Sequence, residues 1–592
     1  MRKDKFEKWY ERLSVFLVYV GGYQTVISIA NLSLKFGPSV IIPVCLFTFV
    51  VGLPVLYLEY SLGQFTSLDT VSCYRRISPV MGGIGISSML LQFLSLVQFQ
   101  PIMVAALHIA INAMGVIITA DYDLPKCFFD YNDPWCNDPR VDCRSLRTHN
   151  SDATVRDYKE INSQCMTNVL TSIDNHITKK VHHHAEHNRE ELMLEHSGLM
   201  QYMNSLIGAS RMDLGGSSSV LLTQFSVWIF LLVITLYGMR FIAKLSVWAQ
   251  LFIMAGSQAL AIICFFLHPL PLVESERETD ENTLLAMYSE ALLHVVLSMR
   301  LGQGGMVVLG SFNRFHNNAL RDCLIATICF IILPFSYGYL SERVMKSYLN
   351  GATISANEAV AYNVGHYLAT WSVFDEYEAV AVFIYATTIV ITIFMQTILL
   401  VLIIYHSVRE QLSVADQAYV NALKRMIVMA AILFQLYMYA RTDEDLQRAI
   451  EHVYVIVSPL IVLFEVLGIV LFYGPRKLFV DMNIMLFGEQ TEKDIRRSFW
   501  KRYVSGMNFL LGVVWTLVIP FAMGYTLYYQ IGHVTERKDE EERAMLIGIC
   551  VVVLISIPIV AAYQIGRGLY ERVSLRYITQ PDVLWGPSEE RH

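Results

Sequence analysis

An apolar stretch near the middle of the chain is interrupted by residues that could do chemistry. Arg300, Gly302 and Gln303 lie where an ordinary membrane helix would continue. Glycine lowers the cost of leaving helical dihedrals, and unwound backbone at membrane depth persists only where protein buries it or where it lines a wet cavity. The stretch 298–305 is therefore predicted to be a broken helix that forms a binding site.

Arg300 is open to two interpretations. A charged side chain inside a membrane helix is by default a functional candidate, and a guanidinium could bind the carboxylate of a substrate or supply the charge of a missing cation. Alternatively, it balances charge by reaching Glu59, Glu465 or water. His294, in the same predicted helix, either titrates in this cavity or is simply hydrogen-bonded within the bundle.

A histidine-rich segment offers a second kind of chemistry. In HHHAEHNREE, residues 182–191, His183 and His187 would share one face of a helix beside Glu186, which is the spacing of a zinc pair. No third ligand accompanies them, so a solvated loop is the alternative. Elsewhere the sequence contains no nucleophile with its base, no metal triad and no nucleotide-binding loop. We therefore expect neither an enzyme nor a cofactor.

The elements that must position these residues are membrane helices. Of the 592 residues, 54% are hydrophobic and 16% are charged, with a mean hydropathy of +0.43. This composition excludes a soluble protein of this length and makes the lipid bilayer a partner. About twelve apolar runs come near the roughly 20 residues that cross a bilayer. They are 13–34, 40–62, 84–119, 220–237, 245–267, 285–310, 324–340, 380–405, 426–439, 453–472, 507–528 and 545–565.

Charged residues set the predicted orientation. Basic residues cluster before the first run and in alternate loops, which places both termini in the cytoplasm. Acidic residues gather in the outward loops, and no nucleic-acid partner is indicated. The predicted division is a cytoplasmic N-terminus at 1–12, a transmembrane domain at 13–566 with an outer loop at about 120–219, and a cytoplasmic C-terminus at 567–592.

The first apolar run contains a glycine pair, Gly21 and Gly22, at its middle. Together with the glycines of 302–305, this pair makes two interrupted helices five runs apart. That pattern is typical of a transporter built from two inverted repeats, whose substrate site lies between the broken helices. Glycines that merely allow close helix packing are the alternative.

Several loop motifs resemble the neurotransmitter:sodium symporters, solute carrier family 6. After the second run, a proline, a membrane glutamate, a Gly-Gln pair and a Cys-aromatic-basic-basic-Ser-Pro sequence recur at the family's spacings. GSFNRFHNNALRD at 310–322 is similar to the family's third inner loop, and FYGPRKLFVDMNIMLFG at 472–488 is similar to the loop after its tenth helix. The matching residues after the second run are Pro54, Glu59, Gly63, Gln64, Cys73, Arg75, Arg76, Ser78 and Pro79.

Four cysteines lie in the long outer loop, where an oxidising exterior would pair them. The segment from Cys127 to Cys136 resembles the family's Cys-x-x-x-Trp-Asn-x-x-x-Cys pair, with a tyrosine in place of the tryptophan. The resemblance therefore implies a disulfide between Cys127 and Cys136. Cys143 and Cys165 are the remaining candidates for a disulfide.

The resemblance implies an all-α polytopic membrane protein of LeuT-like fold. The first ten of its twelve helices would form a 5+5 inverted repeat, with helices 1 and 6 unwound at mid-membrane. Members of the family take up amino acids, monoamines or osmolytes, coupled to sodium and usually to chloride. The residues expected to line the substrate site are Gly22, Tyr23, Phe99, Ser298, Arg300, Gly302 and Gln303.

The family's ion ligands are mostly replaced in this sequence. Thr25 stands where the family has its sodium-binding asparagine, and Phe394 and Met395 stand for the Asp-Ser of the second sodium site. Sodium requires hard oxygen ligands, which phenyl and thioether groups do not supply. Thr25 and Ser298 remain as candidate ion ligands, so sodium and chloride coupling stays open. The replaced chloride positions are Val44, His294, Phe330 and Pro334.

These observations predict a plasma-membrane secondary transporter that moves a small amino-acid-like or organic solute by alternating access. Gly22 occupies the place of the aspartate of amine transporters, which argues against a monoamine because no carboxylate is present to neutralise an ammonium. One alternative is a transporter-like receptor, regulator or assembly partner that no longer pumps, since inner-loop motifs persist while ion ligands are lost. Another is transport driven by protons or by exchange.

Overall fold

Helices form nearly all of the described part of the chain. The computed structural model describes residues 5–119, 157–161, 164–168, 199–203, 218–267, 281–348, 368, 371, 377–412, 417–440, 444–487, 509–535, 540–572, 574, 578–582 and 585–587. The α-helices are α1 (Trp9–Val20), α2 (Tyr23–Phe36), α3 (Ile41–Phe47), α4 (Leu53–Thr66), α5 (Thr70–Ile77), α6 (Gly82–Gln98), α7 (Gln100–Thr119), α12 (Ser218–Thr235), α13 (Met239–Leu267), α14 (Glu281–Ser298), α15 (Gly305–Gly310), α16 (Ala319–Tyr348), α18 (Glu378–Leu412), α19 (Gln417–Ala440), α20 (Glu444–Gly468), α21 (Pro475–Phe487), α24 (Ile519–Thr535), α25 (Glu540–Leu554) and α26 (Ser556–Tyr570). Short 3-10 or π-helical segments are η1 (Pro38–Val40), η2 (Thr48–Gly52), η3 (Pro79–Met81), η6 (Ile469–Tyr473) and η7 (Val514–Val518), and the strands are β1 (Asp157–Ile161) and β2 (Gln164–Asn168).

The predicted runs fall on helices, and some of these helices are long and apolar enough to cross a membrane. Within the described residues, seven spans are long and apolar enough, or eight if the bent pair α1 and α2 counts as one span. The apolar parts of α12 and α14 are helical but too short to count as membrane spans by length. The chain is therefore an α-helical, multi-pass membrane protein, and the count of about twelve spans stays a prediction.

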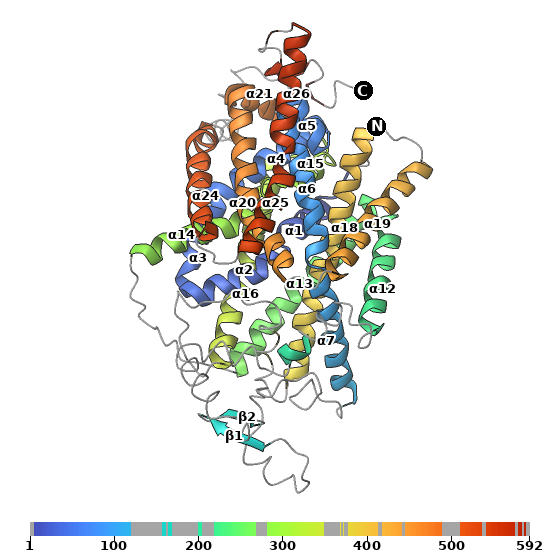
Figure 1. Cartoon of the computed structure of the whole chain (residues 1–592), viewed down its shortest axis with the longest axis vertical. Helices are drawn as coiled ribbons and strands as arrows, with labels where there is room; N and C mark the ends of the chain where they lie inside the picture. Colours follow the sequence, from blue (N-terminus) through green and yellow to red (C-terminus); the bar gives the residue numbers. More distant parts are fainter. Residues whose placement is uncertain are drawn as a thin grey trace.

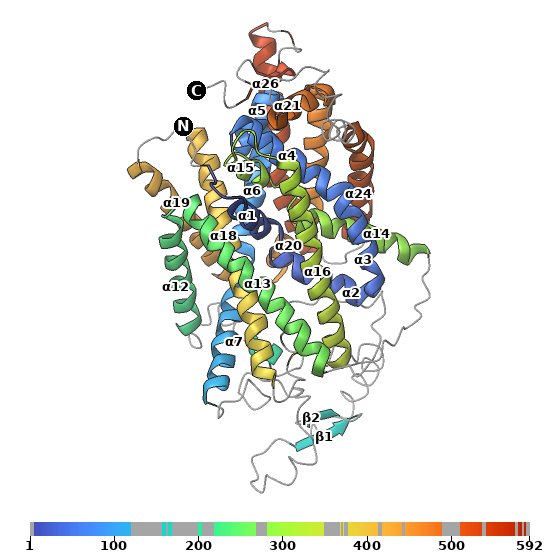
Figure 2. The same ribbon diagram turned by 180° about the vertical axis from the view of Figure 1, so that it is seen from behind.

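The first predicted span is a helix in two pieces. α1 ends before Gly21 and α2 begins after Gly22, with a bend of 53° between them. Gly22 is extended, with φ −72° and ψ −179°. α1 packs against α13, α16 and α18, whereas α2 packs against α14 and α16. In both ribbon views α1 lies at about mid-height of the bundle (Figures 1 and 2), and its side chains from Ser14 to Val20 are buried.

The sixth predicted span is also in two pieces. α14 ends at Ser298, and α15 begins only at Gly305. Between them, Arg300, Gly302 and Gly304 have φ values of +52°, +73° and +71°. This left-handed conformation is readily adopted by glycine but costs other residues about 1 kcal/mol or more. The glycines thus allow the chain to leave the helix, and Arg300 adopts the same conformation at a cost.

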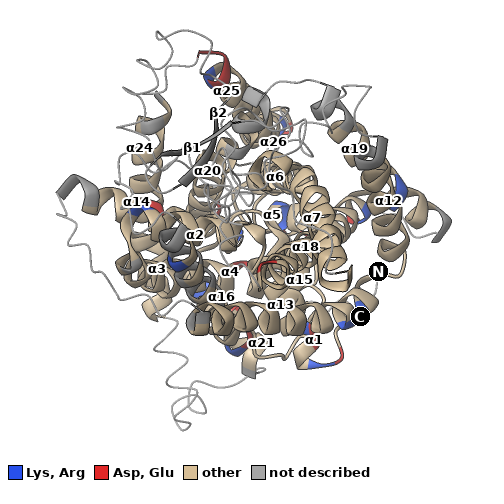
Figure 3. Ribbon diagram, turned by 90° about the horizontal axis from the view of Figure 1, so that it is seen from below, with Lys and Arg blue, Asp and Glu red and all other residues tan. Residues whose placement is uncertain are grey.

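The outer surface and the interior of the bundle differ as expected for a protein in lipid. Seen along the bundle, the ribbon carries few Lys, Arg, Asp or Glu residues (Figure 3). Large apolar side chains such as Trp248, Phe266 and Phe521 are exposed. Because there is no water in a bilayer core, exposed apolar side chains on membrane helices carry no penalty there.

One end of the bundle is closed by the N-terminal segment. The Phe6 N–H donates to Phe312 O at 3.0 Å, and Lys5 Nζ donates to Ser67 Oγ at 2.7 Å. Just inside, Arg12 Nε donates to Asp322 Oδ2 at 3.1 Å, and both side chains are buried. α5, α21 and α26 lie at this end (Figure 1).

The described strands between α7 and α12 lie at the opposite end of the bundle (Figure 1). β1 and β2 form an antiparallel pair there, with Glu160 opposite Cys165 (Figure 1). This small sheet is a departure from a purely helical description. Cys165 lies in β2, and its side chain is not among the described parts. Cys127, Cys136, Cys143, His183 and His187 lie outside the described residues.

Candidate functional site

The unwound segment between α14 and α15 is held by side chains from three other helices. Gly302 N–H donates to Glu59 Oε1 of α4 at 2.8 Å. Its carbonyl accepts from Ser88 Oγ of α6 at 2.8 Å. The Gln303 carbonyl accepts from Gln92 of α6, and the Gly304 carbonyl accepts from Thr70 Oγ1 of α5 at 2.6 Å. Peptide groups that a helix would have paired are therefore satisfied inside the protein, as membrane depth requires.

Arg300 is buried without an anionic partner among the described residues. Its side chain is 3% exposed. Nη1 donates to Gln303 Oε1 at 3.2 Å, and Cζ lies 5.8 Å from the centre of the Tyr19 ring. No described Asp or Glu oxygen lies within 4.0 Å of the guanidinium. The expected contacts with Glu59 or Glu465 are thus not made, and a desolvated positive charge faces the broken helix.

Two buried carboxyl groups lie near the same break. Glu59 of α4 and Glu465 of α20 are both fully buried and close enough to interact electrostatically. Glu59 Oε2 has no hydrogen-bond partner in the described part of the chain. The Tyr74 ring of α5 places its hydroxyl beside Glu465. Burying two such groups as full charges is costly, so this pair favours at least one bound proton.

Ser298 belongs to a chain of hydrogen bonds between α2 and α14. Ser298 Oγ lies 3.2 Å from His294 Nδ1, and the same nitrogen lies 2.8 Å from Ser28 Oγ. The side chains of Ser298 and His294 are both buried. These contacts fit the simpler interpretation of His294, in which it is hydrogen-bonded within the bundle.

Gly22, Tyr23 and Phe99 come together at the break of the first helix. The Tyr23 and Phe99 rings are tilted at 56° with their centres 5.1 Å apart. Gly22 lies against the side-chain amide of Gln396 in α18. Thr25 Oγ1 donates to Val20 O at 3.1 Å, which satisfies one carbonyl at the end of α1. The predicted residues therefore fall into two groups, one at each helix break, with Ser298 in a polar chain of its own.

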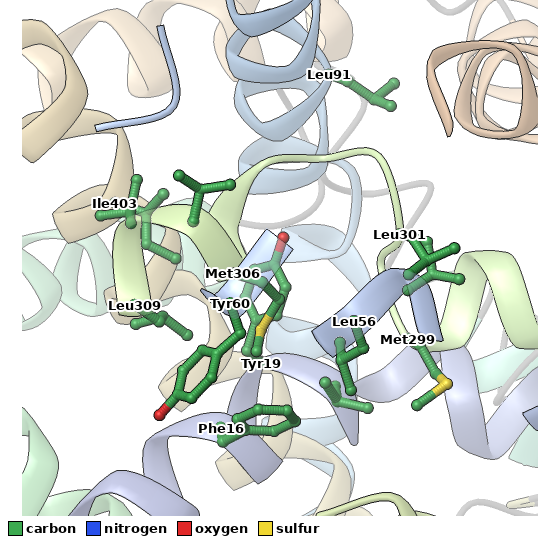
Figure 4. Packing of buried hydrophobic residues seen from close by; sticks show 14 of the residues in the cluster. Phe16, Tyr19, Leu56, Tyr60, Leu91, Met299, Leu301, Met306, Leu309 and Ile403 are labelled. Atoms are coloured by element: carbon green, nitrogen blue, oxygen red, sulfur yellow. The ribbon is translucent and has the colours of Figure 1, made fainter. Parts of the chain in front are cut away.

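Apolar side chains pack closely around the second break. Met306 lies beside Tyr19 and Tyr60, whereas Met299 and Leu301 lie toward Leu56 (Figure 4). All of these side chains are buried. Such packing excludes water from the peptide groups of the break and strengthens the hydrogen bonds that hold it.

Some residues of the site were missed by sequence reasoning. Thr70, Ser88 and Gln92 hold the second break, and Gln396 covers the first. Their one signal is that they are polar residues within or beside apolar runs. Many such residues only bond to their own helix, as Thr392 Oγ1 does to Thr388 O at 2.7 Å. The sequence alone does not separate the two kinds.

Phe394 and Met395, which the family resemblance places at the second sodium site, supply no side-chain oxygen. The Phe394 ring stacks on Phe230 of α12, with ring centres 5.5 Å apart. Met395 is buried in the apolar core. The described side chains at these two positions therefore cannot coordinate a hard cation.

Comparisons with known proteins give a consistent result. Residues 7–244 match the model of the sodium:neurotransmitter symporter family. The sodium- and chloride-dependent glycine transporter 2 of Xenopus laevis is 23% identical over 99% of this chain and 72% of its own length. The sodium- and chloride-dependent taurine transporter of Bos taurus is 24% identical over 54% of this chain, and the sodium-dependent dopamine transporter of Bos taurus is 22% identical over 51%. The last two matches span 46% and 38% of those proteins.

Proposed function

The chain belongs to the sodium:neurotransmitter symporter family, and from this premise we propose that it is a secondary transporter of a small amino-acid-like or organic solute. Members of this family are transporters and not enzymes. The solute would bind between the two broken helices and cross the membrane by alternating access. The proposal includes a plasma-membrane location, cytoplasmic termini, and the transmembrane domain at 13–566 with its outer loop at about 120–219.

The observation that carries this proposal is Arg300. A desolvated guanidinium without a carboxylate partner among the described residues is unfavourable, and a left-handed backbone adds to the cost. A substrate carboxylate would offset both, since carboxylates bind guanidinium groups with strong, directional hydrogen bonds. We therefore infer a solute that carries a carboxylate or a similar anion.

The remaining predicted residues would shape the rest of the substrate site. Tyr23 and Phe99 supply aromatic surface, and Gly22 offers no carboxylate to an ammonium group. Gly302 and Gln303 would shape the site by holding the break open, since their own backbone groups are bonded to Glu59, Ser88 and Gln92. This arrangement suits an amino-acid-like solute better than a monoamine.

Transport by purified protein in liposomes tests the proposal. Labelled amino acids, taurine and amines would be offered with and without sodium and proton gradients. We expect saturable uptake of an anionic or zwitterionic solute, with affinity lost in Arg300→Gly and only partly kept in Arg300→Lys, because the lysine retains the charge but not the paired hydrogen bonds of the guanidinium. Uptake with the same affinity in Arg300→Gly would leave Arg300 only the role of balancing charge.

The ion that drives transport belongs to the same proposal. We infer that the usual sodium and chloride ligands are largely missing, with Thr25 and Ser298 as the candidate ligands that remain. The Thr25 hydroxyl is used at the end of α1, and Ser298 is bonded to His294. Sodium-dependent uptake in the liposome experiment would contradict this inference.

Glu59 and Glu465 favour a proton-driven transporter as the second candidate. Glu59 and Glu465 are buried close to each other beside the second break, so the pair could carry a shared proton across the membrane. We expect Glu465→Gln to abolish uptake driven by a pH gradient while solute exchange across the membrane continues. Unchanged gradient-driven uptake in this variant would remove the pair from the coupling mechanism.

A receptor, regulator or assembly partner that no longer pumps is the remaining alternative. Such a protein would retain the fold and the inner-loop motifs but would not couple solute movement to an ion gradient. Folded protein that binds a solute without moving it under any gradient would support this alternative against transport.

A further inference from the structure

The break in the first helix lies directly against α18. Gln396 of α18 is 2% exposed, and its side-chain amide covers Gly22. A Cβ atom on residue 22 would lie 2.5 Å from Gln396 Cδ and 2.6 Å from Oε1, and nearer still to Nε2. No side chain fits in that space while the amide occupies it. Glycine at position 22 is thus needed for Gln396 to reach the helix break.

The amide donor of Gln396 is not used within the described residues. Nε2 is buried and has no hydrogen-bond partner. Thr397, the next residue, is satisfied, since it accepts from Gln100 Nε2 at 2.8 Å and donates to Ile393 O at 2.7 Å. A buried donor without an acceptor is unfavourable, so its position against the break calls for an acceptor there.

The end of α1 supplies acceptors of the right kind. The last carbonyl groups of a helix have no helical partner and form the negative end of its dipole. Thr25 Oγ1 satisfies the carbonyl of Val20, and the last turn of α1 contains no basic residue. A buried helix end of this type attracts positive charge, which a bound cation or a fixed N–H group can provide.

We propose that Gln396 takes the place of a bound cation at the break of the first helix. Its N–H group places partial positive charge beside Gly22, next to the carbonyl end of α1, without an ion. Gln396 is in this sense a positioning residue. Movement of the first helix away from α18 then requires the amide to leave Gly22. This consequence rests on the proposed alternating access, but the contact between Gln396 and Gly22 is independent of it.

Thermal unfolding of the purified full chain in detergent tests the cation replacement. The melting temperature would be compared in sodium chloride and in choline chloride at equal ionic strength. We expect no difference for the natural protein. Gln396→Glu introduces a carboxylate of the same shape, so sodium should raise its melting temperature by roughly 2 °C or more. A sodium-induced rise in the natural protein, or no rise in Gln396→Glu, would overturn the proposal.

A double-mutant cycle tests the contact independently of transport. Gly22→Ala should lower the melting temperature of the natural protein because its Cβ overlaps the amide, and it should lower it much less in a Gln396→Ala background. Gly115→Ala is the control, since a Cβ on this α7 residue meets nothing within 4 Å. Additive effects of the two substitutions would show that the amide does not cover Gly22. Because both readouts are stabilities, they can fail or succeed whether or not the protein transports a solute.

Discussion

At the residue scale, the conformation of Arg300 leads to a prediction about stability. Arg300→Gly should raise the melting temperature, because it relieves a left-handed backbone worth about 1 kcal/mol and removes a desolvated charge. Arg300→Lys keeps both costs and should not stabilise. The measurement is thermal unfolding of purified protein without solute. A melting temperature that falls in Arg300→Gly would mean that the guanidinium is already compensated in the empty protein.

The chain contains a matched control for this prediction. Arg572 has a φ of +54°, close to the +52° of Arg300, but its side chain is exposed. Arg572→Gly therefore relieves the backbone alone. The difference between the two substitutions isolates the contribution of the buried charge. If both stabilise equally, the charge of Arg300 has no net cost.

The two breaks could be predicted from the sequence because glycines mark them. The conformation of Arg300 could not, since arginine is not a residue type that favours a left-handed φ. The contact of Gln396 with Gly22 was also beyond reach, because it joins residues 374 positions apart in sequence through the packing of α18 on the break. Sequence patterns indicate which residues are unusual and leave their partners unspecified.

At the element scale, α4 and α15 pack with their backbones in contact. A Cβ on Gly63 would lie 2.7 Å from the carbonyl carbon of Val307, and a Cβ on Gly310 would lie 3.1 Å from the backbone of Gln64. Gly63→Ala must therefore push the two helices apart, which we expect to cost about 1–3 kcal/mol of stability. Because α15 follows the second break, the same shift should also weaken solute binding.

Gly115→Ala is again the appropriate comparison. Its Cβ meets nothing within 4 Å, and alanine is the better helix former by up to about 1 kcal/mol. Chemical or thermal unfolding of both variants gives the measurement. Equal stability of Gly63→Ala and the natural protein would mean that α4 and α15 can separate without loss.

The helices themselves were the most predictable part of the fold. Hydropathy identifies segments that belong in lipid, and the described parts of the predicted runs coincide with helices. The interruptions within helices were less predictable. η2, for example, joins α3 to α4 as a π-helical segment inside one span. Apolar composition is the same on both sides of such a segment, so only packing reveals it.

At the scale of the whole molecule, both ends of the chain meet at the closed end of the bundle. The N-terminal segment lies against Phe312 and Ser67. Near the C-terminus, Asp582 N–H donates to Arg76 O at 2.9 Å, and Trp585 packs against Phe65 at 5.9 Å between ring centres. The C-terminal segment therefore connects the end of α4 that carries Phe65 to the chain that leads into α6. Opening of this end requires these contacts to break.

The attachment of the C-terminal segment should depend on pH through Asp481 of α21. Tyr473 donates its hydroxyl to Asp481 and accepts from Trp585 Nε1 at 2.9 Å. Burial raises the pKa of Asp481 from 3.8 to about 6. The hydrogen bond with Trp585 lowers this pKa, but burial raises it by more. If the docked segment causes that burial, the protonated carboxyl is favoured in the docked state, so docking is strongest at low pH and weakens as pH rises through about 6.

Hydrogen exchange of residues 578–587, corrected for the pH dependence of the intrinsic rate, measures this attachment. Between about pH 5 and pH 7.5 we expect protection to fall by up to about tenfold. This is the largest change that the difference between the ordinary and the raised pKa of Asp481 allows, and it applies if docking alone raises that pKa. Asp481→Asn, which stays neutral, should keep the segment protected at both pH values, and Trp585→Ala should leave it unprotected at both. A pH dependence that survives in Asp481→Asn would assign it to another group. Protection that is equal at both pH values in the natural protein would show that docking does not bury Asp481.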